Sequence, residues 1–158
     1  MSSTVAKGKE LEQRIFDILR SIEIECKWTG GSGDGGVDIS GVVVGIPFVI
    51  QCKNWTKHKI GPSVIREFEG ALTRQTRGTI GVVVGRSKNR FTPGAIVTAK
   101  TSIYDIILTD KKDLCIDLIQ LVADRLNRSY DFNANPPFPS PMNAQYSENC
   151  FPSSVPAP

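Results

Sequence analysis

An uninterrupted apolar run over residues 80–84, Ile-Gly-Val-Val-Val, constrains the fold more than any other feature of the sequence. A run this short and this rich in β-branched residues predicts a strand that is buried on both faces. The flanking segments 62–76 and 93–100 place apolar residues at helical spacing, and each begins with a proline, which the first turn of a helix accommodates. This helix–strand–helix succession predicts an α/β fold.

The remaining elements extend the same pattern. Further helices are predicted over residues 7–22 and 114–129, and further strands over 24–28, 37–44, 48–54 and 104–108. Gly45-Ile46-Pro47 predicts a hairpin turn, and Asp110 is expected to cap the last helix. Together these elements predict one domain over residues 1–130, built as a mixed β-sheet flanked by helices on both faces.

Residues 131–158 have a different composition. Seven of the ten prolines lie in this segment, it contains no Lys or Arg, and it shows no apolar periodicity. We therefore predict a disordered, proline-rich tail. No stretch of the 158-residue chain approaches the roughly 20 apolar residues of a membrane span, so a membrane protein is not expected.

The four cysteines bear on the cellular compartment. Cys26, Cys52, Cys115 and Cys150 are widely separated and form no CxxC pair, so neither a zinc site nor a disulfide framework is predicted. The first residues show neither an apolar signal segment nor the arginine-rich pattern of a mitochondrial import signal. We expect an intracellular protein in a reducing compartment, with cytoplasm, nucleus and mitochondrion left open.

Positive charge is concentrated in the middle of the sequence. Residues 53–100 contain ten Lys or Arg against two Glu, a net charge of +8, although the whole chain carries only +3. A phosphate-rich partner would explain this concentration, and a solvated basic face would explain it equally well.

Three polar residues are expected to meet on neighbouring strands. The glycine-rich turn 30–36 leads to Asp38 at the start of one strand, and a tight hairpin returns the chain to Gln51 and Lys53 on the next. An acid, an amide oxygen and an ammonium group at one sheet edge suit a hard cation, a phosphodiester and an activated water. Taken singly, Asp38 is better explained as a turn residue and Lys53 as a surface lysine. The turn lacks the GxxxxGK[ST] pattern of a nucleotide-binding loop.

Taken together, these residues carry a resemblance to a known family. Gly-Asp-Gly-Gly-Val-Asp-Ile at 33–39, Phe-Val-Ile-Gln-Cys-Lys-Asn at 48–54 and Ile-Arg-Glu-Phe-Glu-Gly at 65–70 resemble the catalytic domain of Mrr-type restriction endonucleases, within the PD-(D/E)XK superfamily. The resemblance extends over about residues 7–125, and Gln51-Cys52-Lys53 matches the QxK form of the motif found in this branch. Residues 7–12, Lys-Gly-Lys-Glu-Leu-Glu, resemble the first helix of Holliday-junction resolvases.

The resemblance implies a restriction-endonuclease-like fold and a role for each site residue. It implies that Asp38 is the principal Mg²⁺ ligand, with Mn²⁺ as a substitute, and that Glu12, the Gln51 side chain and the Cys52 carbonyl supply further oxygens. Lys53 would orient the attacking water and offset charge in the transition state. The activity implied is metal-dependent hydrolysis of DNA phosphodiester bonds. The alternative is a nucleic-acid-binding module that has kept the fold and lost turnover.

Other residues are weaker candidates. Asp34 is either a metal ligand or a turn residue, and Glu67 either supports the site or pairs with a basic neighbour. His58, the only histidine, excludes a multi-histidine metal centre. Contacts to DNA phosphates are predicted for the segment after the catalytic strand and for the next basic turn, through Trp55, Lys57, Lys59, Arg86, Lys88 and Arg90. The sequence leaves open whether Trp55 packs under the sheet instead, and whether the protein forms a homodimer.

Overall fold

The computed structural model describes residues 4–29 and 35–134. In chain order its elements are α1 (Thr4–Ser21), β1 (Glu25–Trp28), β2 (Ile39–Val43), β3 (Ile46–Lys53), α2 (Pro62–Leu72), β4 (Ile80–Gly85), the 3-10 helix η1 (Lys88–Arg90), α3 (Pro93–Thr101), β5 (Ile106–Asp110) and α4 (Leu114–Ala134). Every helix and strand predicted from the sequence is present. Helix η1 forms within the segment predicted as a basic turn.

The chain divides into two compact units, Met1–Arg125 and Leu126–Pro158, so α4 begins in the first and ends in the second. The second unit is described only up to Ala134. None of the helices in the described part of the chain combines the length and the apolar run that a bilayer crossing demands.

The five strands form one sheet in the order β1-β2-β3-β4-β5. The first three strands pair antiparallel, with Ile39 opposite Ile50, whereas β3, β4 and β5 are parallel, with Gln51 opposite Val83. The three parallel strands therefore end at one edge of the sheet, and Lys53, Gly85 and Asp110 lie next to one another there. We call this edge the carboxyl edge.

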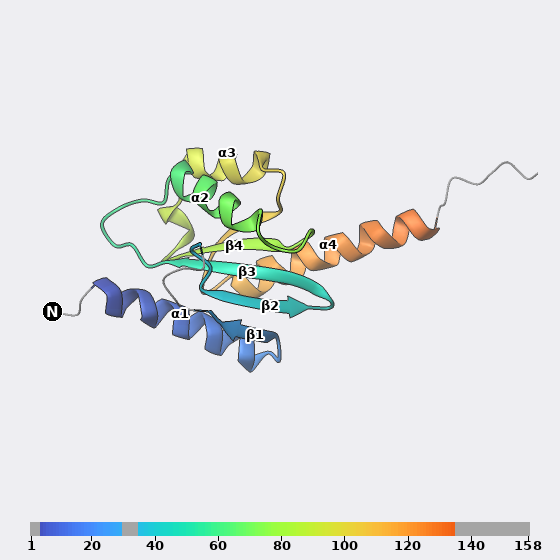
Figure 1. Cartoon of the computed structure of the whole chain (residues 1–158), viewed down its shortest axis with the longest axis horizontal. Helices are drawn as coiled ribbons and strands as arrows, with labels where there is room; N and C mark the ends of the chain where they lie inside the picture. The colour runs from blue at the N-terminus through green and yellow to red at the C-terminus, as the bar shows by residue number, and fades with distance from the viewer. Residues whose placement is uncertain (1–3, 30–34, 135–158) are drawn as a thin grey trace, which may run out of the picture. The chain divides into compact units, whose positions relative to one another are not determined.

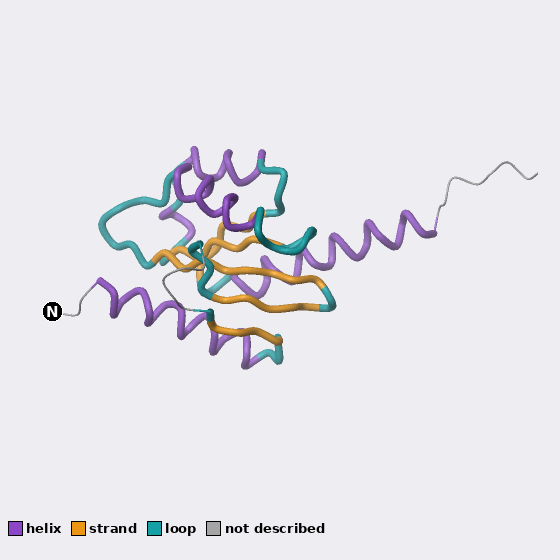
Figure 2. Tube along the Cα trace, viewed as in Figure 1, coloured by secondary structure: helices purple, strands orange, loops and turns teal. Residues whose placement is uncertain are grey.

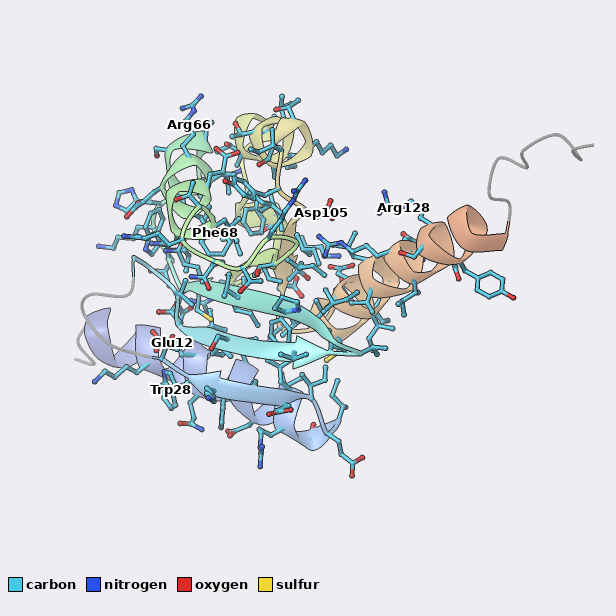
Figure 3. All side chains as sticks on the ribbon, turned by 45° about the vertical axis from the view of Figure 1, so that its right-hand side comes forward. Glu12, Trp28, Arg66, Phe68, Asp105 and Arg128 are labelled. Atoms are coloured by element: carbon cyan, nitrogen blue, oxygen red, sulfur yellow. The ribbon has the colours of Figure 1, made fainter. Side chains whose placement is uncertain are left out.

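Each face of the sheet carries its own apolar core, with helices α2 and α3 on one side of the strands and α1 on the other (Figure 1 and Figure 2). On the α1 face, residues such as Leu11 and Leu118 pack against Phe48 and Ile50 of β3. On the opposite face, Phe68 of α2 packs with Val49 and Val83. Figure 3 shows Phe68 pointing from α2 toward the sheet while Arg66 points away from it. The predicted mixed α/β sheet with helices on both faces is confirmed.

The hairpin between β2 and β3 turns earlier than predicted. Val43 pairs with Ile46, so Val44 and Gly45 alone form the turn, with φ angles of 49° and 76°. Two successive positive φ angles match the type I′ turn, whose twist suits two-residue hairpins. The expected turn over residues 45–47 was wrong because valine is rarely found at positive φ, so the sequence pattern did not place Val44 there.

The last helix is longer than predicted. It continues through Ala134, beyond the end expected near Ser129, since no proline or glycine follows until Pro136. The Asp110 carboxylate accepts hydrogen bonds from the backbone amides of Lys112 and Asp113 and so organises the turn before α4, close to its predicted capping role. Residues 135–158, most of the predicted tail, lie outside the described residues.

Candidate active site

Asp38 lies immediately before β2 and is tied to β3 on both sides of Gln51. Its backbone amide donates to the Ile50 carbonyl oxygen over 2.8 Å, and its carboxylate Oδ2 accepts from the Cys52 amide over 2.6 Å. The Asp38 carbonyl oxygen also accepts from the Thr29 amide at the end of β1. These three hydrogen bonds fix the carboxylate beside the Gln51-Cys52-Lys53 segment, as the spacing of the motifs predicts.

Two glycines make the approach to Asp38 sterically possible. Gly35 and Gly36 have φ angles of 65° and 88°, a region that side-chain-bearing residues rarely adopt. A Cβ atom at Gly36 would collide with the amide nitrogen of Gln51, and one at Gly35 would collide with the Arg74 guanidinium. The glycine-rich turn thus allows the backbone to pass directly over the Gln51 side chain.

Gln51 is buried, with 3% of its surface exposed. Because side chains alternate along a strand, it lies on the same face of β3 as Val49, the face covered by α2 and α3. Its side-chain oxygen Oε1 is buried and has no hydrogen-bond partner within the described residues. A buried acceptor without a hydrogen-bond partner lowers the stability of the fold by about 1–3 kcal/mol. Accepting a hydrogen bond or binding a cation would remove this penalty for the Gln51 oxygen.

Lys53, at the end of β3, extends over an aromatic ring. Its ammonium nitrogen Nζ lies 5.4 Å from the centre of the Trp55 ring, within the range of a cation–π interaction. Trp55 is 37% exposed, so the pair sits at the surface of the carboxyl edge. Packing of Trp55 under the sheet, one of the two alternatives left open by the sequence, does not occur.

Glu12 enters the site from α1. Its carboxylate Oε2 accepts a hydrogen bond from Trp28 Nε1 over 3.2 Å, and the Trp28 ring lies 6.2 Å from that of Phe16. Figure 3 shows Glu12 and Trp28 close together beside α1 and β1. Trp28 was missed from the sequence, because its pairing with Glu12 depends on how α1 packs against β1.

Burial and neighbouring charges set the protonation of Asp38. Burial raises the pKa of its carboxyl group from the ordinary 3.8 to about 6; the hydrogen bond from the Cys52 amide opposes this rise, the Glu12 charge adds to it and the Lys53 charge opposes it. Burial, Asp38 and Glu12 likewise raise the pKa of the Cys52 thiol well above its usual value.

Acidic side chains alone do not form a complete metal-binding site in the described residues. Across the described residues, no group of three His, Cys, Asp or Glu side chains forms a metal-binding cluster. A cation here would need the amide oxygen of Gln51 and backbone oxygen as well as the carboxylates of Asp38 and Glu12. Glu67 lies exposed on α2, and Asp34 lies outside the described residues.

The predicted DNA-contacting residues fall into two groups. Lys57, Lys59 and Arg86 are exposed. Lys88 instead forms ion pairs with two carboxylates at the start of α4, Asp113 and Asp117, each over 2.9 Å. The Arg90 guanidinium donates to the carbonyl oxygens of Trp55, Thr56 and His58, so it holds the loop after β3 in place. Contacts to DNA by these six residues remain a prediction.

Comparison with known proteins gives related sequences and structures. The chain is 35% identical over 89 residues to an uncharacterized mitochondrial protein, C824.03c, of Schizosaccharomyces pombe (strain 972 / ATCC 24843), covering 52% of this chain and 36% of that protein. Among solved structures, a chain of MspJI restriction endonuclease in complex with a 27-mer oligonucleotide is similar at 21% identity and a TM-score of 0.41, covering 72% of this chain and 31% of that one. The chain thus spans about a third of the length of each relative.

A match to a family model shows which family the chain belongs to. The Mrr_cat family model, a restriction endonuclease domain, matches residues 5–117, which is more than half of the chain. This segment contains Glu12, Asp38, Gln51 and Lys53, and the match confirms the resemblance found in the motifs. The chain belongs to the restriction endonuclease family of Mrr-type catalytic domains, and its fold is that of a nuclease.

Proposed function

We propose that this chain is a Mg²⁺-dependent endonuclease that hydrolyses DNA phosphodiester bonds at the Asp38, Gln51 and Lys53 site. Membership of the restriction endonuclease family supports nuclease activity in general. The observation that carries the metal-dependent proposal is the buried Gln51 Oε1, which has no hydrogen-bond partner within the described residues and belongs to the strand segment tied to the Asp38 carboxylate.

The groups at this edge fit a hard divalent cation. Mg²⁺ prefers oxygen ligands, and Asp38, Glu12, the Gln51 amide and the Cys52 backbone carbonyl would supply four oxygens. When bound, Mg²⁺ supplies polarisation of the phosphoryl oxygen and eases deprotonation of the attacking water. Gln51 replaces a carboxylate by a neutral amide, so we expect weaker Mg²⁺ binding than at a site with three acids, and Mn²⁺ as a working substitute.

Lys53 is proposed to act on the attacking water and on the transition state. A fixed ammonium group lowers the energy of a developing negative charge most when it is already in place before the reaction. The Trp55 ring, 5.4 Å from Lys53 Nζ, keeps the lysine at the carboxyl edge without neutralising its charge. Asp38 acts as a ligand in its ionised form, which predominates above its pKa of about 6.

DNA is the proposed substrate because the basic residues surround this same edge. Lys57 and Lys59 lie in the loop after β3, and Arg86 follows β4, so exposed cations lie on two loops at the carboxyl edge. Such residues neutralise phosphates without reading bases, and we expect binding that tolerates different sequences.

The test is cleavage by the purified chain of linear, methylated and four-way-junction DNA, in Mg²⁺ and in EDTA. Cleavage is expected in Mg²⁺ and not in EDTA, and Lys53→Ala should reduce it by about a hundredfold or more, as loss of a preorganised charge does in other hydrolases. Lys27→Ala, at an exposed position of β1, is the matched control and should cleave normally.

Two outcomes would contradict the proposal. Undiminished cleavage by Lys53→Ala would remove the assigned site. DNA binding by the wild-type chain without cleavage of any substrate would instead identify a binding module with this fold.

A further inference from the structure

A hollow lies at the carboxyl edge of the sheet. It has a volume of about 370 Å³ and is lined by three residues of α1 and by one residue from each loop that follows β3, β4 and β5, namely Glu10, Leu11, Arg14, Asn54, Arg86 and Lys111. We call this hollow the edge pocket, since the three parallel strands all end at its rim.

Two residues that line the edge pocket are sequence neighbours of candidate active-site residues. Leu11 of the pocket directly precedes Glu12, and Asn54 directly follows Lys53. Because neighbouring residues are about 3.8 Å apart along the chain, these two pocket residues lie directly beside two residues of the candidate site. A nucleic acid bound at the site can therefore extend to the pocket.

The charge of the edge pocket favours an anion. Three cationic side chains, Arg14, Arg86 and Lys111, face a single carboxylate, Glu10. Glu10 pairs with Arg14 over 2.8 Å, but both side chains are more than half exposed, and exposed ion pairs contribute little free energy. Within the described residues, Arg86 and Lys111 form no ion pair, in contrast to Lys88, whose charge is taken up by Asp113 and Asp117.

We propose that the edge pocket binds a phosphate group of the DNA adjacent to the one cleaved, and so positions the substrate. This inference rests on the proposed nuclease function and adds a substrate-positioning site to it. Guanidinium groups bind phosphate oxygens through paired hydrogen bonds, and such contacts fix the register of a nucleic acid. The phosphate belongs either to the continuous backbone or to a strand end, and the two sources share this chemistry.

The test compares two charge-removing variants. The pocket variant is Arg86→Gln with Lys111→Gln. The matched control is Arg77→Gln with Lys100→Gln, which removes the same charges from exposed positions before β4 and at the end of α3, away from the carboxyl edge. All four positions are exposed, so equal melting temperatures are expected for the two variants and the wild type. DNA binding is measured in EDTA, where metal-dependent cleavage does not contribute.

The pocket variant is expected to bind duplex DNA about tenfold more weakly than the wild type, as removal of charge-assisted hydrogen bonds to phosphate predicts. The slope of log Kd against log salt concentration should fall by about 0.9 for each phosphate that the protein no longer neutralises. Arg86→Lys, which keeps the charge, should recover part of the affinity. Equal Kd values and equal salt slopes for the pocket variant and the control would overturn the proposal.

Two further arms identify the source of the phosphate. Neutral methylphosphonate links are placed one at a time in a duplex too short for a second binding register. If the backbone supplies the phosphate, a link at one position should weaken wild-type binding and leave the pocket variant unaffected. If a strand end supplies the phosphate, the wild type should bind DNA with 5′-phosphate ends more tightly than DNA with 5′-hydroxyl ends, and the pocket variant should not distinguish the two. Either result supports a phosphate site in the edge pocket.

Cleavage assays separate this inference from the proposed function. In Mg²⁺ the pocket variant should raise KM about tenfold with kcat retained, because it loses a contact made equally in the ground state and the transition state and keeps the reacting groups. If wild-type DNA cleavage fails but the pocket variant still weakens binding, the nuclease proposal fails and the pocket stands. If Lys53→Ala abolishes cleavage while the pocket variant behaves like its control, the pocket proposal fails and the nuclease function stands.

Discussion

Trp28 donates a hydrogen bond from its indole nitrogen to the Glu12 carboxylate over 3.2 Å. Trp28→Phe removes this donor and keeps an aromatic ring against Phe16. Groups that orient a ligand typically affect metal affinity by tenfold or more, so the Mg²⁺ concentration for half-maximal cleavage should rise about tenfold. Tyr104→Phe, which removes the polar group of an aromatic ring just before β5 and outside the candidate site, should leave this Mg²⁺ concentration unchanged. An identical Mg²⁺ requirement in both variants would show that Trp28 does not position Glu12.

Gln51 substitutions separate metal binding from stability. Gln51→Leu removes the buried oxygen that lacks a partner within the described residues, so the melting temperature in EDTA should stay level or rise, while Mg²⁺ binding and cleavage are lost. Gln51→Glu adds a negative charge and should tighten Mg²⁺ binding with activity retained. Calorimetric Mg²⁺ titration and thermal denaturation check the two effects. Normal Mg²⁺ binding by Gln51→Leu would exclude Gln51 as a ligand.

The raised pKa of Asp38 predicts a pH-dependent stability. Folding favours the protonated carboxyl group, whose pKa rises from 3.8 to about 6 because of burial, so wild-type stability should fall as the pH increases between these values. Asp38→Asn keeps an oxygen for the Cys52 amide and has no charge to bury. In EDTA, the gain in melting temperature of the variant over the wild type should grow from pH 4 to pH 6 and then level off. A gain that is the same at every pH would contradict the assigned shift. Cleavage by this variant should be lost.

The β2–β3 hairpin predicts a stabilising substitution. Val44 adopts a φ of 49°, where a β-branched residue is strained, and it is 70% exposed. Val44→Asn should stabilise the fold by about 1 kcal/mol, since asparagine is favoured in type I′ turns, and should leave cleavage unchanged. Val42→Asn, within β2, is the control and should lower the melting temperature. Equal effects at both positions would mean that the turn conformation is not the cause.

Local patterns predicted the elements of this fold because each leaves a clear signature in the sequence. The run at residues 80–84 is the fully buried β4, and the alternation along β3 places Gln51 and Cys52 on opposite faces, as expected. Contacts between distant segments left no such signature. Trp28 meets Glu12, and Lys88 meets Asp113, only because the sheet brings separate elements together. Positive φ at Val44 was equally invisible, since its strain is offset by the pairing of the whole hairpin.

The two-faced sheet has a consequence for how this protein acquires its function. Glu12 comes from a helix that belongs to one core, whereas Gln51 points into the other, and Asp38 is tied to the strand between them. A partly folded chain with a single core would hold an incomplete set of these groups. The DNA cleavage that we propose would then begin only after both cores of the fold have formed.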